Sequence, residues 1–309
     1  MKYAPIILFV YKRPVETQRV LEALAANPEA AQSELIVYAD GPKNEADIGR
    51  CMEVRHLVEN FRGFAKITLR AAEKNKGLAN SVISGVSEML EVFDRVIVLE
   101  DDLVTSKYFL RFMNEALDKF ENDDNICSIH AFSYPPVCHD VQYFLRRGAD
   151  CWGWATWRRG WQLFSPDSGK LHDEIIKRKS AKLFDRNGAF PFTKMLKDQS
   201  EGKIDSWAIR WYASAFLAGK YMLQSNVMLI ENIGLGSEAT HCVSGRMHYK
   251  IILADEPVVF DRPAEPEPAS SFKMYQHYLQ KDNIPFAVRC LIKIKKIIKH
   301  LFCLRKTPV

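Results

Sequence analysis

Val96-Ile97-Val98-Leu99-Glu100-Asp101-Asp102-Leu103 is the stretch that decides the fold. Its four consecutive branched aliphatic residues predict a strand buried on both faces, as in a parallel sheet. Three carboxylates follow at the carboxyl end of this strand, where open α/β sheets bind their ligands, and they would repel one another unless a cation lay there. Hard oxygen ligands favour Mg²⁺ or Mn²⁺ bridging a diphosphate. The alternative is a strand that ends in a solvated acidic turn.

Strands and helices alternate from the N-terminus to about residue 131. The other predicted strands in this part are 5–11, 35–39, 65–70 and 126–131, and helical patterns lie between them. This alternation predicts an α/β fold with a mostly parallel, doubly wound central sheet and flanking helices. The acidic triplet then follows the fourth strand, at the edge where a nucleotide would bind.

Other polar residues also stand where predicted strands end or helices begin. Arg13 follows the first strand, where it can meet phosphate or serve as a solvated loop charge. Asp40 follows the second strand, where it can accept from a base or ribose, although Asp40-Gly41-Pro42 is also a good turn. Lys76 precedes a helix, where a cation and free amides favour an anion, but a plain helix entry has the same pattern.

The second half of the chain is rich in tryptophan. Four tryptophans lie within residues 152–161, and such rings can stack on sugars or form the core of a second layer. Asp205 stands at the start of a predicted helix, as a helix cap or as a functional carboxylate. The Gly-containing loop 232–241 could fold over a phosphate or be a plain loop, and His241 in it is a candidate metal or diphosphate ligand or a structural histidine.

The net charge of +5 is unevenly distributed. Residues 287–309 hold seven Lys or Arg and no acidic residue, so the body is not a general polyanion binder and no nucleic-acid partner is expected. Residues 284–304 predict a basic amphipathic helix that lies on an anionic membrane or docks on the domain. Seven Cys, without paired spacing, argue against disulfides and zinc and fit a cytoplasmic protein.

Together these segments resemble a glycosyltransferase of the GT-A (Rossmann-like) fold. The chain is most similar to the N-acetylglucosaminyltransferase I-like branch and more distantly similar to the family-two sugar transferases of bacterial polysaccharide synthesis. The resemblance covers about residues 4 to 241. It rests on the opening strand with Arg13, on Asp40-Gly41, on Val98-Leu99-Glu100-Asp101-Asp102, and on Trp152-Gly153-Trp154 followed by Asp205-Ser206-Trp207.

On the donor side, the resemblance implies a nucleotide-diphosphate sugar, with UDP favoured, and a Mn²⁺ or Mg²⁺ cofactor. The family pattern implies that Arg13 meets the donor phosphates and that Asp40 reads the uracil base. Glu100-Asp101-Asp102 resembles a form of the DxD motif, in which Asp102 would ligate the metal while Glu100 and Asp101 contact ribose and sugar.

On the acceptor side, the resemblance implies an inverting transferase whose catalytic base is Asp205. Trp152, Gly153, Trp154 and Trp207 would then shape the substrate pocket. Ser206 replaces one of the family's paired acids, so the base assignment rests on Asp205 alone. The expected acceptor is a hydroxyl of a glycan or a lipid-linked oligosaccharide in surface polysaccharide synthesis.

This interpretation gives a GT-A domain over residues 1–265, with a nucleotide-binding half (1–131) and an acceptor-binding half (132–265). Residues 266–309 would form a C-terminal helical tail. The family's N-terminal membrane anchor and stem have no counterpart here, so we expect a cytoplasmic enzyme, peripheral on the inner membrane face. The alternatives are a nucleotidyltransferase, against which the glycine-free loop Tyr11-Lys12-Arg13-Pro14 argues, and a non-catalytic membrane scaffold.

Overall fold

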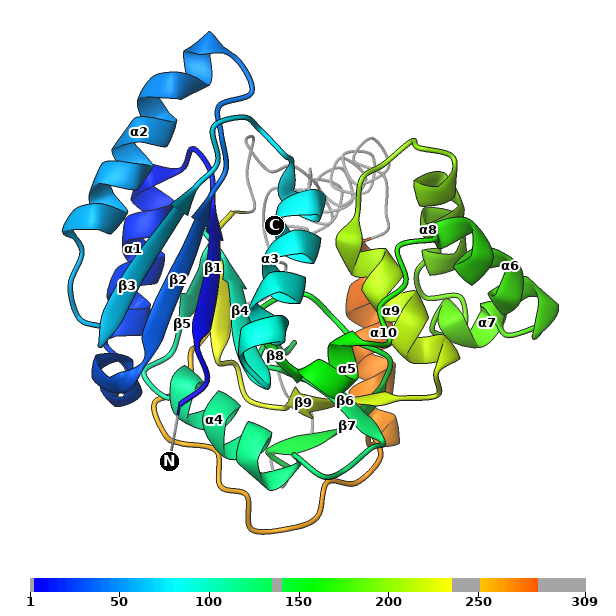
Figure 1. The fold of residues 1–309 in the computed structure, drawn as a ribbon. Helices are drawn as coiled ribbons and strands as arrows, with labels where there is room; N and C mark the ends of the chain where they lie inside the picture. The colour runs from blue at the N-terminus through cyan, green and yellow to red at the C-terminus, as the bar shows by residue number, and fades with distance from the viewer. Residues whose placement is uncertain (1–2, 135–140, 235–250, 283–309) are drawn as a thin grey trace, which may run out of the picture.

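The computed structural model describes residues 3–134, 141–234 and 251–282. The first part of the chain alternates strands and helices as predicted (Figure 1). These elements are β1 (Ile6–Val10), α1 (Pro14–Ala25), a short 3₁₀ helix (Pro28–Gln32), β2 (Glu34–Ala39), α2 (Glu45–Asn60), β3 (Lys66–Ala71), α3 (Leu78–Val92) and β4 (Arg95–Glu100).

The central sheet has the strand order β3-β2-β1-β4-β8-β6-β9-β7. The later strands are β6 (Ile126–His130), β7 (Tyr143–Arg147), β8 (Trp154–Trp157) and β9 (Tyr221–Ser225). β1 pairs in parallel with β2 and β4, β2 with β3, and β6 with β9, whereas β8 runs antiparallel to both its neighbours and β7 to β9. The predicted mostly parallel sheet is confirmed, with one difference. A strand from the tryptophan-rich segment separates β4 from β6.

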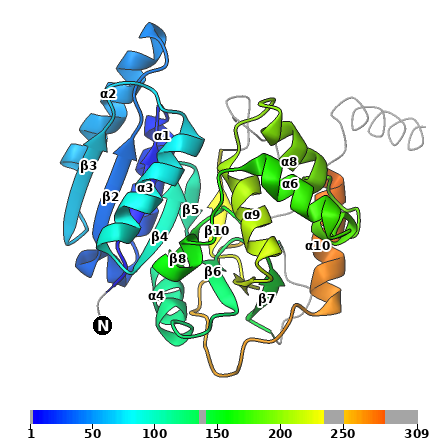
Figure 2. The same ribbon diagram turned by 45° about the vertical axis from the view of Figure 1, so that its right-hand side comes forward.

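Helices cover both faces of this sheet (Figure 2). Successive side chains of a strand point to opposite faces, so Ile6 and Leu8 of β1 enter one apolar cluster and Ile7 and Phe9 enter another. Helices α1, α2 and α4 (Phe109–Lys119) close the first cluster, and α3 and α9 (Trp207–Leu217) close the second. β1 and β4 are buried on both faces, which explains their continuous aliphatic sequences, whereas β3 is largely exposed at the edge of the sheet.

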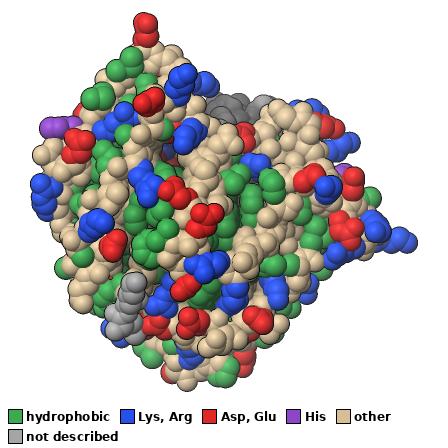
Figure 3. All heavy atoms as spheres, in the orientation of Figure 1, with side chains coloured by type: hydrophobic (Ala, Val, Ile, Leu, Met, Phe, Trp, Pro, Cys, Tyr) green, Lys and Arg blue, Asp and Glu red, His purple; other side chains and the backbone are tan. Residues whose placement is uncertain are grey.

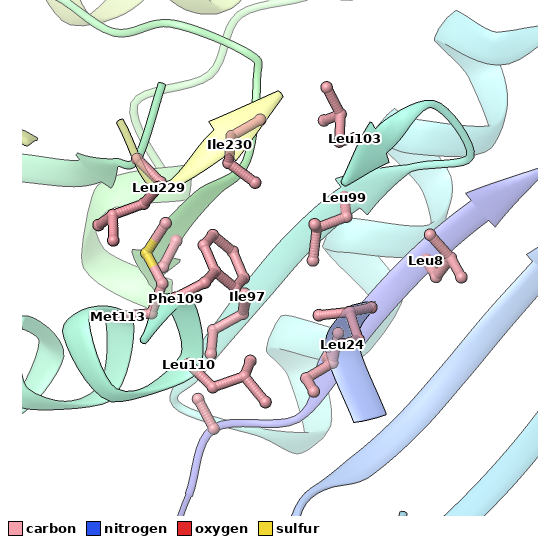
Figure 4. Packing of buried hydrophobic residues seen from close by; sticks show 14 of the residues in the cluster. Leu8, Leu24, Ile97, Leu99, Leu103, Phe109, Leu110, Met113, Leu229 and Ile230 are labelled. Carbon is pink, nitrogen blue, oxygen red and sulfur yellow. The ribbon is translucent and has the colours of Figure 1, made fainter. Parts of the chain in front are cut away.

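A small second sheet fixes the turn that carries the acidic triplet. β5 (Leu103–Thr105) follows this turn and pairs antiparallel with β10 (Ile230–Asn232). Leu99, Leu103 and Ile230 are all buried in one cluster beneath the turn (Figure 4). Packing therefore holds the triplet's backbone from both ends.

The remaining helices come from the second half of the chain. They are α5 (Arg158–Trp161), α6 (Ser168–Lys177), α7 (Ala181–Phe184), α8 (Phe192–Ser200) and α10 (Ala269–Asp282). The segment 165–195 is polar in sequence, but its helices bury Leu171, Ile175 and Phe184 in a third apolar cluster with α9. The lysines of α6, α7 and α8 are all exposed.

The first part of the predicted C-terminal tail packs on the body. Pro266 bridges Leu145 of β7, and Glu267 forms a buried ion pair of 2.6 Å with Arg146. The predicted basic helix at 284–304 lies outside the described residues. Within them, no helix combines the length and apolar character needed to cross a bilayer. On the face seen in Figure 3, basic and acidic side chains are interspersed.

Candidate active site at the strand ends

The carboxyl ends of β1, β2 and β4 meet at one edge of the sheet because these strands are parallel neighbours. This is the upper edge of the sheet in Figure 1. Arg13 and Asp40 follow β1 and β2, and Glu100 ends β4 and is followed by Asp101 and Asp102. The structure thus brings together three segments that lie far apart in the sequence.

Arg13 is bound to the acidic triplet. Its Nη1 donates to Oδ2 of Asp102 at 3.0 Å and lies 3.6 Å from Oδ1 of Asp101. The backbone N–H of Tyr11 donates to Oδ2 of Asp101 at 3.2 Å. The chain that leaves β1 therefore lies directly against the chain that leaves β4.

Burial and mutual repulsion disfavour the ionised forms of the three carboxylates. Burial, together with the Asp102 and Asp101 carboxylates, raises the pKa of Glu100 to about 8. Burial and Asp102 raise the pKa of Asp101 to about 7, although Arg13 opposes this shift. Burial also raises the pKa of Asp102. The single charge of Arg13 compensates three carboxylates only in part.

A divalent cation fits this arrangement. Carboxylates that are buried, close together and under-compensated are stabilised by an added cation. Among the described residues, no three His, Cys, Asp or Glu side chains converge as a complete metal site. One or two carboxylates completed by substrate phosphates and water commonly bind Mg²⁺ in this way. The other predicted ligand, His241, lies outside the described residues.

Gly234 lies against the Asp102 carboxylate. A Cβ on Gly234 would stand only 1.9 Å from Oδ2 of Asp102. The approach is held by two hydrogen bonds, from the Ile233 N–H to the Asp102 carbonyl oxygen at 2.8 Å and from the Gly234 N–H to Oδ1 of Asn232 at 2.9 Å. The predicted phosphate loop thus begins in contact with the triplet. The sequence pattern did not identify Gly234 individually.

Asp40 is occupied by the loop that precedes α3. Its Oδ1 accepts from the backbone N–H groups of Gly41 and Lys76, both at 2.8 Å. Its Oδ2 accepts from Gly77 N–H and from the Asn75 side chain, both at 3.0 Å. A carboxylate has about four lone-pair sites, so these bonds leave no free acceptor for a nucleobase in this conformation. The Lys76 side chain is exposed.

Asp205 reaches the same loop from the other half of the chain. The N-cap of α9 is Ser206, whose Oγ accepts from the Ile209 N–H at 3.4 Å, so the capping interpretation of Asp205 is wrong. The Asp205 side chain is 60% exposed. Its Oδ2 lies 3.9 Å from the position of a Cβ on Gly77.

The tryptophans divide between core and surface. Trp154 and Trp207 are 1% and 3% exposed and stack on each other with ring centroids 5.4 Å apart. Trp152 is half-buried and packs edge-on against Phe132. Gly153, which lies between Trp152 and Trp154 in the sequence, adopts a positive φ of 61°. We therefore assign Trp154 and Trp207 to the core, and Trp152 remains a candidate for substrate contact.

The position of the largest described cavity volume does not coincide with the acidic triplet. A cavity of about 460 Å³ lies instead between the carboxyl end of α2 and the start of β3, lined by Val58, Phe61, Phe64 and Ile67 among others. No charged cluster comparable to the triplet borders it; its charged lining residues are Glu59, Arg62 and Lys66.

No family model and no curated protein matches this sequence. Among solved structures, the chain is similar to S. aureus TarS 1–349, at 12% identity over 76% of this chain and 61% of that one, with a TM-score of 0.42. A mannosyltransferase from Pyrobaculum calidifontis, in complex with GDP-Man and Mn²⁺, matches at 16% identity over 43% of this chain and 37% of that one (TM-score 0.32). A putative nucleotide-diphospho-sugar transferase from Desulfovibrio desulfuricans G20 matches at 12% identity over 54% and 68% (TM-score 0.34). The chain thus spans less than two thirds of the first two of these proteins.

Proposed function

We propose that this protein is a glycosyltransferase that moves a sugar from a nucleotide-diphosphate sugar to a hydroxyl group. The observation that carries the proposal is the meeting of Arg13 with the under-compensated triplet Glu100–Asp102 at the carboxyl ends of parallel strands. The guanidinium of Arg13 can contact the phosphates of a sugar diphosphate, and the carboxylates at this edge can hold the metal that the diphosphate requires.

On the donor side, Asp102 would hold Mn²⁺ or Mg²⁺, and the bound cation would neutralise charge on the diphosphate. Arg13 would contact the phosphates, while Glu100 and Asp101 bind ribose and sugar. Lys76 would add positive charge at the α3 loop. Asp40 would support the nucleotide indirectly, because its oxygens hold that loop.

On the acceptor side, we propose Asp205 as the general base and Trp152 as a wall of the acceptor pocket. The acceptor O–H would give its proton to the carboxylate while its oxygen bonds to the anomeric carbon. The bond from that carbon to the diphosphate oxygen breaks, and its electron pair leaves with the diphosphate. A single displacement of this kind inverts the anomeric configuration. The acceptor class we propose is a glycan or lipid-linked oligosaccharide of surface polysaccharide synthesis.

Donor binding and turnover test this proposal. UDP-N-acetylglucosamine, UDP-glucose and GDP-mannose are each added with and without Mn²⁺, and Tm and nucleoside diphosphate release are measured. A ligand at 100 times its Kd stabilises by about 2.7 kcal/mol. We expect Asp102→Asn to lose the Mn²⁺-dependent part of the shift. Asp205→Asn should keep the shift and lose about 10²–10⁴-fold in transfer. The proposal fails if no member of the panel raises Tm or is turned over.

We also propose that the basic segment 284–304 holds the protein at the inner face of the cytoplasmic membrane. Its support is the sequence alone, in which basic residues alternate with aliphatic ones without any acid. Each basic residue near anionic lipid contributes about 1 kcal/mol. The full chain should float with phosphatidylglycerol vesicles and not with phosphatidylcholine vesicles, and a chain ending at residue 282 should bind neither. Equal flotation of both chains would exclude this anchor.

A further inference from the structure

Arg210 occupies an unfavourable place for a cation. It lies in the first turns of α9, where the helix dipole disfavours positive charge, and its residue is only 9% exposed. Burial lowers the pKa of Arg210, and the charge of Asp205 opposes that shift. A buried cation in such a position needs a compensating interaction.

The contacts of Arg210 supply that interaction. Its Nε donates to the Ser206 carbonyl oxygen at 3.1 Å, and its Nη2 lies 3.5 Å from Oδ1 of Asp205. Since Ser206 also caps α9, the guanidinium is fixed to the end of a rigid helix. Asp205, by contrast, is mostly exposed and has no packing of its own to orient it.

The two oxygens of Asp205 have different surroundings. Oδ1 faces Arg210, whereas Oδ2 faces Gly77 in the loop held by Asp40. In the described part of the chain, Oδ2 has no hydrogen-bond partner. One oxygen is therefore anchored, and the other is directed toward the half of the site that would hold the donor.

We propose that Arg210 is the positioning residue for Asp205, holding its carboxylate turned so that Oδ2 is free to take the acceptor proton. This inference rests on the proposed function, in which Asp205 is the base. The acceptor proton would move to Oδ2 as described above, and Arg210 would exchange no proton, because a guanidinium stays charged.

The test compares Arg210→Gln and Arg210→Lys, each alone and combined with Asp205→Asn. Arg159→Gln is the matched control, because Arg159 also binds backbone carbonyls at a helix start but follows β8 at the edge of the sheet where β4 begins, opposite the acidic triplet. Donor hydrolysis with Mn²⁺ and the three nucleotide sugars gives kcat and KM. Thermal unfolding reports the folded fraction of each variant.

We expect Arg210→Gln to lower kcat about 10-fold at unchanged donor KM, because the carboxylate of Asp205 is then no longer held in the orientation for proton transfer. Arg210→Lys should recover part of the loss. In the Asp205→Asn background, Arg210→Gln should cause no further loss. Arg159→Gln should shift Tm alone.

The results distinguish the positioning role of Arg210 from the proposed function with Asp205 as the base. A wild-type kcat in folded Arg210→Gln, or equal losses in both backgrounds, would overturn the positioning role while the proposed function stands. Undiminished transfer by Asp205→Asn, or an inactive wild type, would overturn the proposed base or the proposed function instead.

Discussion

Replacing Gly234 by alanine is the sharpest perturbation of the acidic triplet that the structure offers. The new methyl carbon would lie 1.9 Å from Oδ2 of Asp102. Carbon and oxygen atoms need at least about 3 Å, so the glycine backbone or the carboxylate must move by about 1 Å. Displacement of a catalytic group by 1 Å can cost about 10²-fold in rate. We therefore expect Gly234→Ala to lose about two orders of magnitude in turnover.

The assay is Mn²⁺-dependent release of nucleoside diphosphate, together with the Tm shift that donor and Mn²⁺ cause. Gly49→Ala is the control, because Gly49 lies in α2 with open space around its Cβ position. That change should leave turnover intact and stabilise the helix by about 1 kcal/mol. Wild-type turnover and a wild-type Tm shift in Gly234→Ala would refute the close approach and, with it, our view of how Asp102 is held.

Three further predictions concern charge and packing. The folded-state pKa of Glu100, about 8, exceeds 4.5, the ordinary pKa of a glutamate side chain, so protonation favours the folded state. The Tm of the metal-free protein should therefore fall as pH rises from about 4.5 to about 8, and Glu100→Gln should flatten this pH dependence. Asp40→Asn places an amide NH₂ group opposite backbone N–H donors. The free energy of unfolding measured in urea should therefore fall by about 1–3 kcal/mol. An unchanged midpoint would contradict the four hydrogen bonds described for Asp40. Trp154→Ala empties the tryptophan cluster and should cost about 3–5 kcal/mol, whereas a cost below 1 kcal/mol would show that the ring is not core.

Much of the fold of residues 1–131 was predictable because its signals are local. A buried parallel strand needs an unbroken aliphatic run, and polar residues that follow such runs must gather at one edge. This reasoning placed Arg13, Asp40 and the triplet at the observed edge.

The second half was less predictable because its contacts are non-local. The four residues of β8 carry two tryptophans and no alternating polar face, so nothing local showed that they pair with β4 and β6. Gly234 meets Asp102 only through the fold. The sequence carries a partial signal for Arg210, because a cation near a helix start is unfavourable to the helix dipole. The buried environment of Arg210, however, depends on tertiary packing.

The insertion of β8 also constrains how the chain acquires its structure. β6 pairs with β8 and β9, and both are synthesised after it. A nascent chain that has emerged only to residue 131 therefore leaves the β8-facing edge of β4 uncovered and β6 without a neighbour, and bare edges of this kind recruit other strands. Ribosome-bound intermediates should thus depend on chaperones until about residue 225 has emerged, and the whole sheet should form late and cooperatively, at the slow rate typical of distant pairings.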